Sequence, residues 1–314
     1  MQTWALIADC FREAFDRKIF WVMVAITLIV TSAMACIGFD ERGISFLFGV
    51  WRLEYSNPAF HGGLAAIGIP LKFVAAIAIN ILDTFVGWIG AVLALVATAG
   101  IFPRFMERGA IDVPLAKPLP RWKLFLGKYL GSMVFILMQA TLFVALTFVV
   151  IGLRWRAWLP GYLLSIPLMV ILFSYLYGVC ALVGVMTRST ATAILVSLAA
   201  WLVFATPATV LQTMSIVQPR GNGRIVQVAR LARWVLPKTG EVAYIAGRWA
   251  GAGIELDVPV PPPAGFADDN QAAAMRELSE QQLKISALKS IGSSLAFELV
   301  IVLLAMRRFS KTDF

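Results

Sequence analysis

Four polar side chains stand within long apolar runs of the sequence, where they have the chemistry to bind a solute or a proton inside a membrane. These residues are Asn80, Asp83, Gln139 and Glu298. A carboxylate in hydrocarbon is energetically costly and usually faces a cavity or a partner. Asn80 and Asp83 are three residues apart, which places them on one face of a helix. Two interpretations stay open: a polar translocation cavity or proton-coupled site, or structural hydrogen bonds between helices and snorkelling near an interface.

The sequence holds few of the residues that catalytic sites use. Its single histidine is His61, which argues against haem ligation, metal catalysis and histidine-based acid–base chemistry. The three cysteines have no CxxC spacing, so we predict neither a disulfide framework nor a metal site. Neither a GxxxxGK[ST] nor a GxSxG motif is present. We expect no catalytic residue, metal or cofactor in this chain, since an intramembrane enzyme built on the carboxylates above would lack a nucleophile or metal set.

The composition predicts the elements that position these side chains. Apolar residues make up 60% and charged residues 14% of the 314-residue chain. A soluble domain has about 45–50% apolar and about 25% charged residues, so we predict an all-α integral membrane protein. About 20 apolar residues cross the hydrocarbon as a helix, and six runs of that length form one polytopic membrane domain over residues 1–314. These runs cover about 19–38, 71–102, 124–152, 160–186, 190–215 and 287–306.

Lysine and arginine in the short loops predict the orientation, because such residues concentrate on the cytoplasmic side. With the N-terminus inside, the cytoplasm receives the residues around Lys18, the basic stretch 104–128 and the basic tail 307–311. We therefore expect both termini to be cytoplasmic in a bacterial inner membrane. The net charge of +9 then reflects loops that face anionic lipid and one partner surface, rather than nucleic acid. The outer loop at 216–286 is long enough to escape the rule.

Several segments outside the spans have helical patterns. Residues 2–16 carry apolar side chains at helical spacing, which predicts an amphipathic helix in the inner interface or a cytosolic extension of the first span. Ile44, Phe46, Leu47 and Trp51 suggest a short interfacial helix. In the outer loop, we predict a basic amphipathic helix at 223–237. A second helix at 269–285 continues into the last span, because no Pro or Gly intervenes before Gly292.

A basic island at residues 104–131 separates the second and third spans. Its cations outnumber its two carboxylates, Glu107 and Asp112, by three to one. The cations are Arg104, Arg108, Lys117, Arg121, Lys123 and Lys128. Three prolines stiffen the segment. Two interpretations remain: the bases anchor the loop to anionic headgroups, or the island docks on a protein, where its charges give orientation and specificity.

The stretch ERGAIDVPLAKPLPRWKLFLGKYLG resembles the cytoplasmic loop between the second and third spans of type-two ABC-transporter permeases. The matching positions are Glu107, Gly109, Ile111, Leu115, Lys117, Pro118, Arg121, Gly127, Lys128 and Gly131. Gly109 stands one position earlier than the commonest spacing. The tail RRFSKTDF and the lead FREAFDRKIF are also similar to this family. Within it, the chain most resembles the permease that accompanies copper-site maturation of nitrous oxide reductase. The long outer loop departs from the compact members and leaves the cargo open.

The resemblance implies the membrane subunit of an ABC transporter, more similar to exporters than to importers. It implies a separate ABC ATPase subunit that holds ATP and Mg²⁺, and a second permease copy that forms a homodimer in the lipid bilayer. The ATPase-coupling loop would span residues 104–121 and use Glu107, Arg108, Gly109, Asp112, Lys117, Pro118 and Arg121. The outer loop at 216–286 could bind a periplasmic or extracellular partner. The alternative is a non-transport scaffold or sensor whose outer loop binds a partner and whose island signals inward.

Overall fold

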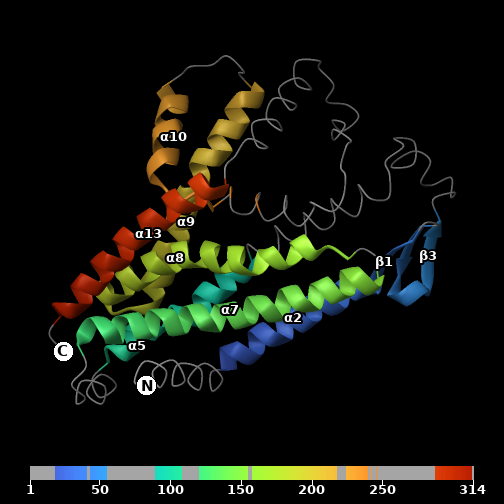
Figure 1. The fold of residues 1–314 in the computed structure, drawn as a ribbon, viewed down its shortest axis with the longest axis horizontal. Coiled ribbons are helices and arrows are strands. Elements are labelled where there is room, and N and C mark those ends of the chain that lie inside the picture. The colour runs from blue at the N-terminus through green and yellow to red at the C-terminus, as the bar shows by residue number, and fades with distance from the viewer. Residues whose placement is uncertain are drawn as a thin grey trace. The chain divides into compact units, whose positions relative to one another are not determined.

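The computed structural model (Figure 1) describes residues 18–40, 43–54, 89–107, 120–154, 158–217, 224–239, 241, 245 and 287–312, and the structural statements below concern these residues. Three predicted segments lie outside this part of the chain. They are the amphipathic helix at 2–16, residues 71–88 of the second span and the helical stretch at 269–285.

Helices dominate the described residues. They are α2 (Lys18–Cys36), α5 (Ile101–Phe105), α7 (Arg121–Arg154), the 3₁₀ turn η2 (Pro160–Leu164), α8 (Ser165–Thr187), α9 (Thr190–Val217), α10 (Arg224–Val235) and α13 (Ala287–Ser310). Four helical stretches are long and apolar enough to cross a membrane: Arg121–Arg154, Pro160–Thr187, Thr190–Pro207 and Leu288–Ser310. Two shorter apolar helices, Phe20–Cys36 and Ile89–Phe105, fall in the first and second predicted spans. The prediction of a helical membrane protein is confirmed, and the count of six spans stays a prediction.

A two-residue turn joins α8 to α9. Arg188 adopts the left-handed conformation with φ 53° and donates its N–H to the carbonyl oxygen of Gly184 at 3.0 Å, which closes the last turn of α8. Ser189 then caps the start of α9, because its Oγ accepts a hydrogen bond from the N–H of Thr192 at 3.4 Å. Local capping therefore explains the break between α8 and α9, which falls where the sequence separates the predicted spans at 160–186 and 190–215.

A small antiparallel sheet follows α2, where the sequence suggested a short helix at residues 44–51. The strands are β1 (Ile37–Asp40), β2 (Gly43–Phe46) and β3 (Trp51–Glu54), in the order β1-β2-β3. The suggested helix is wrong because these segments alternate apolar and polar residues with the period of two that strands require. The 3₁₀ turn η1 (Leu47–Gly49) also has positive φ angles at Leu47, Phe48 and Gly49, which no α-helix accommodates.

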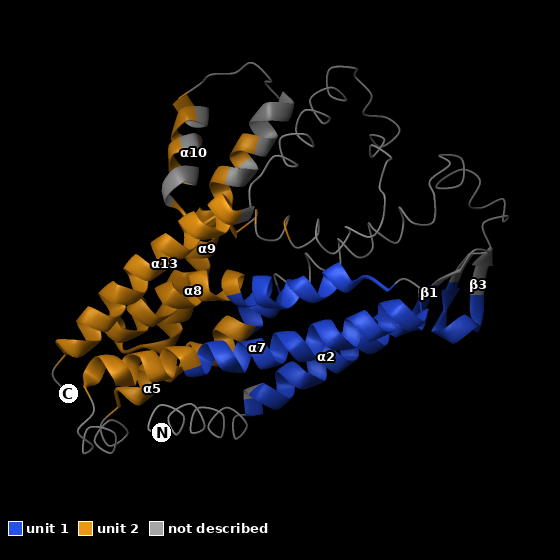
Figure 2. Cartoon of the chain, viewed as in Figure 1, with its two compact units in different colours: residues 1–93, 131–170, 246–255 blue, residues 94–130, 171–245, 256–314 orange. Residues whose placement is uncertain are grey.

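The chain divides into two compact units, each assembled from separate stretches (Figure 2). Unit 1 comprises Met1–Leu93, Gly131–Val170 and Ala246–Glu255. Unit 2 comprises Ala94–Leu130, Ile171–Ile245 and Leu256–Phe314. Both α7 and α8 contribute residues to each unit, so the boundaries at 130/131 and 170/171 fall within helices.

In unit 1, α2 packs along the second part of α7. The Phe20 ring lies 5.8 Å from the Phe135 ring, and near the other end of α2 the Arg154 Nε donates a hydrogen bond to the carbonyl oxygen of Ala35 at 3.0 Å. Residue numbers rise together along both helices, so the two helices run parallel. Parallel packing is what the first and third spans of a polytopic protein require.

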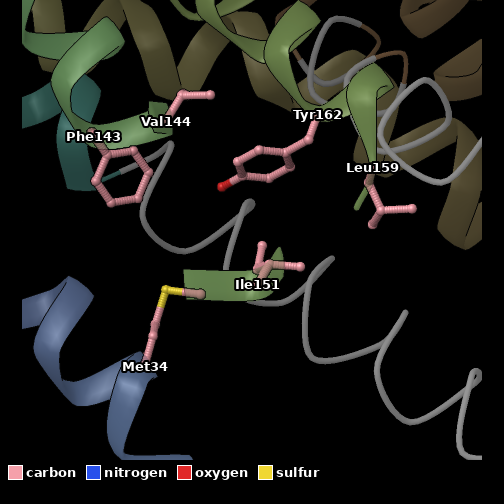
Figure 3. Close-up of a cluster of buried hydrophobic side chains, with 6 residues drawn as sticks. All are labelled: Met34, Phe143, Val144, Ile151, Leu159 and Tyr162. Atoms are coloured by element: carbon pink, nitrogen blue, oxygen red, sulfur yellow. The ribbon is translucent and has the colours of Figure 1, made fainter. Parts of the chain in front are cut away.

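An apolar cluster fills this packing near the carboxyl ends of α2 and α7 (Figure 3). It consists of Met34 from α2, Phe143, Val144 and Ile151 from α7, and Leu159 and Tyr162 from the segment that leads into α8. The Tyr162 hydroxyl meets the Thr147 hydroxyl at 3.0 Å, so the one polar atom that Tyr162 brings into the cluster is satisfied. The ring can therefore contribute apolar area without leaving an unpaired group.

Gly152 in α7 supports the same region by lacking a side chain. A Cβ atom at this position would lie 2.6 Å from the Trp158 ring, whereas a Cβ at Gly292 in α13 meets nothing within 4 Å.

Gly152→Ala should displace Trp158 and destabilise the fold by about 1–3 kcal/mol, the cost of overpacking. Gly292→Ala should be neutral or stabilising by about 0.5–1 kcal/mol. Thermal unfolding in detergent, followed by circular dichroism, measures both; equal Tm values for the two variants would contradict this packing.

Candidate functional site

Three segments meet in unit 2 where the basic island begins and ends. The Phe105 ring at the end of α5 lies 6.1 Å from the Phe309 ring at the end of α13. The Phe125 ring in the second turn of α7 lies 5.9 Å from the same Phe309 ring and 4.8 Å from the Phe102 ring. Phe125 and Phe309 are both fully buried. We name these four phenylalanines the loop base, because they join the chain before and after residues 108–119 to the last turn of α13.

Arg121, the first residue of α7, adds charged hydrogen bonds beside the loop base. Its Nη1 donates hydrogen bonds to the carbonyl oxygens of Ser310 at 3.2 Å and Thr312 at 2.8 Å. The last carbonyl groups of a helix have no partner within the helix and carry the negative end of its dipole. A guanidinium in this position therefore closes α13 and ties it to the start of α7.

A carboxylate joins three helices deeper in unit 2. Glu298 of α13 is half-buried. Its Oε1 accepts a hydrogen bond from the Tyr129 hydroxyl of α7 at 2.8 Å, and its Oε2 accepts one from the Ser174 hydroxyl of α8 at 2.7 Å. Gly178, one turn after Ser174, lies beside the Glu298 side chain, since a Cβ there would make ordinary van der Waals contact with its Cγ at 3.7 Å. Both carboxylate oxygens of Glu298 thus accept hydrogen bonds from hydroxyl groups of other helices.

Aromatic rings line the Tyr129 side of this carboxylate. Tyr129 stacks on Tyr177 with ring centroids 5.3 Å apart, and Tyr177 stacks on Phe173 at 5.3 Å. Tyr129 also stacks on Phe125 of the loop base at 6.2 Å. A continuous set of ring contacts therefore connects the loop base with the residues around Glu298.

Gln139 occupies a comparable position in unit 1. It is 6% exposed, and its Nε2 donates a hydrogen bond to the Thr27 Oγ1 of α2 at 2.9 Å. Its Oε1 is buried with no hydrogen-bond partner among the described residues. Gln139 and Glu298 belong to different units, and Asn80 and Asp83 lie outside the described residues. The two predicted polar residues that the structure describes each link helices through a hydroxyl side chain.

Residues 4–314 match the sequence model of a family described as ABC-2 family transporter protein. The chain belongs to this family. It is the membrane permease component of an ABC transporter, and the family implies an ABC ATPase as partner and a multi-pass membrane location. No curated protein matches the chain. The predicted resemblance to type-two permeases is confirmed, while the likeness to the nitrous oxide reductase maturation permease stays a prediction.

The permease exposes charge beside its loop base. Glu107, two residues after Phe105, is exposed and donates its N–H to the carbonyl oxygen of Arg104 at 3.2 Å. The exposed basic side chains near the loop base are Arg104, Lys123, Arg307, Arg308 and Lys311. The other predicted coupling residues, Arg108, Gly109, Asp112, Lys117 and Pro118, lie outside the described part of the chain.

Sequence reasoning missed the hydroxyl partners of the permease's intramembrane polar groups. Tyr129, Ser174 and Thr27 stood in the sequence as ordinary members of apolar runs. Hydroxyl residues in a membrane helix are a recognised signal for interhelical hydrogen bonds, but the signal names no partner. Among the residues that the structure describes, no group of three or more His, Cys, Asp or Glu side chains is placed to hold a metal ion.

The Tyr129–Glu298 pair can be tested with a double-mutant cycle. Tyr129→Phe removes the donor and Glu298→Gln alters the acceptor, so their effects on the free energy of unfolding should be non-additive. The coupling should lie near the range measured for hydrogen bonds between membrane helices, about 0.6–1.7 kcal/mol. Tyr129→Phe combined with Gln139→Leu is the control and should be additive, because Gln139 lies in the other unit. Additive effects in both cycles would show that the Tyr129 hydroxyl does not support Glu298.

The Arg121 contacts can be tested by thiol accessibility at the end of α13. In a permease whose Cys10, Cys36 and Cys180 are replaced by Ser, Ser310→Cys reports opening of the last turn to a maleimide. Arg121→Ala removes charge-assisted hydrogen bonds of about 1.5 kcal/mol or more, so labelling should accelerate about tenfold. Lys123→Ala, which removes an exposed cation nearby, should leave the rate unchanged. Equal acceleration by both substitutions would point to a general charge effect and not to the Arg121 hydrogen bonds.

Proposed function

We propose that this permease is an exporter driven by a separate ATPase subunit that docks on residues 104–121. One observation carries the proposal: both ends of this loop are bound to the last turn of α13, through Phe105 and Phe309 on one side and Arg121 on the other. A loop that only anchored the chain to headgroups would need no such connection. A loop that transmits force needs one, because its displacement must move a spanning helix.

Helix α13 offers the route for that displacement. Glu298 lies eleven residues before Phe309, which corresponds to about 16 Å along a helix at 1.5 Å per residue. Movement of the loop base would reach the Tyr129 and Ser174 hydrogen bonds along this rigid element. We propose that Glu298 contributes to the translocation pathway in this way. We extend the same role to Gln139, whose Oε1 has no described partner, and to Asn80 and Asp83.

The orientation proposed from the sequence, with both termini cytoplasmic in a bacterial inner membrane, has support from helix directions. The start of α7 and the end of α13 lie together through Arg121, so the island and the C-terminal residues share a side. Lys18 begins α2, and within unit 1 α2 runs parallel to α7. In the proposed orientation, the expected cytoplasmic cations would lie on one face of the membrane.

The docking surface would use the exposed charges beside the loop base. Glu107 and the basic residues Arg104, Lys123, Arg307, Arg308 and Lys311 are accessible, and charges at an interface rim govern orientation and rate of association more than affinity. The coupling roles of Arg108, Gly109, Asp112, Lys117 and Pro118 remain part of the proposal. ATP and Mg²⁺ would be bound by the ATPase subunit.

A second, identical permease copy completes the proposed transporter. The four candidate spanning helices of one chain leave large apolar side chains exposed on α9 and α13, including Leu195, Leu202 and Leu299. Lipid or a second copy can cover such a surface. Export is favoured over import because the chain has no feature that resembles the dock of an importer's binding protein. The outer loop at 216–286 is the part we propose for a periplasmic or extracellular partner.

Purification of the tagged permease in mild detergent tests the proposal directly. We expect a stoichiometric subunit with nucleotide-binding motifs and vanadate-sensitive ATPase activity in the eluate. Glu107→Lys should reduce recovery of that subunit about tenfold, equivalent to about 1.4 kcal/mol, without changing membrane insertion. Lys289→Glu is the matched control, because Lys289 is exposed in the first turn of α13, far from the loop base.

Two outcomes would count against the proposal. Recovery of the ATPase with Glu107→Lys at the level of the unaltered permease would remove Glu107 from the docking surface. A folded permease that carries no ATPase at all would favour the scaffold or sensor, whose partner would then be sought at the outer loop.

A further inference from the structure

The turn between β2 and β3 presents four large apolar side chains in five consecutive residues. Leu47, Phe48, Val50 and Trp51 are 59%, 69%, 79% and 76% exposed. We call residues 47–51 the apolar tip. Contiguous apolar surface of this kind is rare where a protein meets water, and it marks a site of interaction with lipid or protein.

The strand register shows which end of the sheet carries the apolar tip. Ile37, which directly follows α2, pairs with Phe46, and Phe46 pairs with Trp51. At the other end of the strands, Asp40 pairs with Gly43 and Gly43 pairs with Glu54. The apolar tip therefore lies beside the end of α2, and Asp40 and Glu54 mark the opposite end of the sheet.

Arg154 fixes the depth of the apolar tip relative to the helices of unit 1. From the last residue of α7, its Nε donates to the carbonyl oxygen of Ala35 at 3.0 Å and its Nη2 donates to the Ser45 Oγ at 3.4 Å. Its Cζ lies 5.2 Å from the centre of the Phe48 ring. Phe48 is thus level with the last turns of α2 and α7, where a spanning helix leaves the hydrocarbon.

Two apolar residues of the turn occupy strained backbone positions. Leu47 and Phe48 have φ angles of 48° and 58°, and the left-handed conformation is unfavourable for residues other than Gly, Asn and Asp. A turn with Asn or Gly at these positions would form at lower cost but would expose no apolar side chains. The strain is therefore consistent with a use for Leu47 and Phe48 outside the fold of the turn itself.

We propose that the apolar tip inserts into the membrane leaflet at the carboxyl ends of α2 and α7, the outer leaflet in the predicted orientation. Phe48, Val50 and Trp51 would enter the boundary between headgroups and acyl chains, the depth at which Trp and other amphipathic rings concentrate. Arg154 would lie at the depth of the lipid phosphates, to which a guanidinium is complementary.

Lipid is favoured over a protein occupant for two reasons. Helix α2, beside whose end the apolar tip lies, also exposes Trp21, Val22, Leu28 and Ile29, and lipid covers such side chains on a membrane helix. The cation that flanks the apolar tip also matches the phosphate layer that borders the hydrocarbon. The sheet would then anchor the carboxyl end of α2 at the membrane interface. This anchoring would not require a bound ATPase.

Depth-dependent fluorescence quenching of the full permease in proteoliposomes tests this inference. With Cys10, Cys36 and Cys180 replaced by Ser, Val50→Cys carries an environment-sensitive label on the apolar tip, and Asp40→Cys carries it at the opposite end of the sheet. We expect lipids with a nitroxide near the headgroup to quench the label at position 50 about threefold more than at position 40, and aqueous iodide to show the reverse order. Leu47→Cys provides a second labelled position, and size-exclusion chromatography confirms that each variant is folded.

Each other pattern would overturn the inference. Equal iodide quenching at positions 50 and 40 would place the apolar tip in water. Protection of position 50 from iodide without quenching by the nitroxide lipids would mean that protein covers the apolar tip, and crosslinking of the same cysteine would then show whether that protein is a second copy.

Discussion

Inside a bilayer a polar side chain has no water to bond with, and this constraint determines how the helices of the permease can pack. Each buried polar group must find its partner within the protein or leave a hydrogen bond unmade. The Gln139–Thr27 pair sets the rotation of α7 against α2, and the Glu298 contacts with Tyr129 and Ser174 set the rotation of α13 against α7 and α8. Because neighbouring residues point about 100° apart around a helix, a shift by one residue would break these contacts.

Hydroxyl side chains in the permease divide into two groups according to this constraint. Thr31, Thr98 and Thr141 donate to the carbonyl oxygen four residues earlier in their own helix, so they are satisfied without any partner helix. Thr27 does the same and also accepts from Gln139. Hydroxyls of the first group bond only within their own helix, which makes them compatible with an apolar surrounding. Hydroxyls of the second group, such as that of Thr27, also bond to a side chain of another helix and so specify which helices meet. Substitutions in the second group should affect function more than those in the first, because they alter how the helices contact one another.

The parts of the fold that depend on local composition could be predicted, and those that depend on distant partners could not. The third span is predicted at 124–152, and helix α7 covers Arg121–Arg154, since the length of an apolar run is a property of neighbouring residues. The short helix suggested around 44–51 is wrong because residues 43–46 and 51–54 each alternate apolar and non-apolar positions, and the apolar turn between them carries no helical period.

The candidate site shows the same division. Glu298 and Gln139 could be recognised as costly in hydrocarbon from their types alone. Their partners could not, since Tyr129 is 169 residues from Glu298 and no spacing rule links them. Arg121 was grouped with the docking residues because of its charge and its neighbours. That its guanidinium binds the carbonyl oxygens of α13 follows only from the tertiary structure.

The loop base also imposes an order on the biogenesis of the permease. Arg121 binds the carbonyl oxygen of Ser310, 189 residues later in the chain. At a synthesis rate of about 5–20 residues per second, Arg121 would wait roughly 10–40 s after it is made before its partner exists. During that interval the island is present while α13 is missing, so a nascent permease cannot yet offer an ATPase the complete loop base. Engagement of the ATPase would thereby become a check that the last spanning helix has been made and inserted.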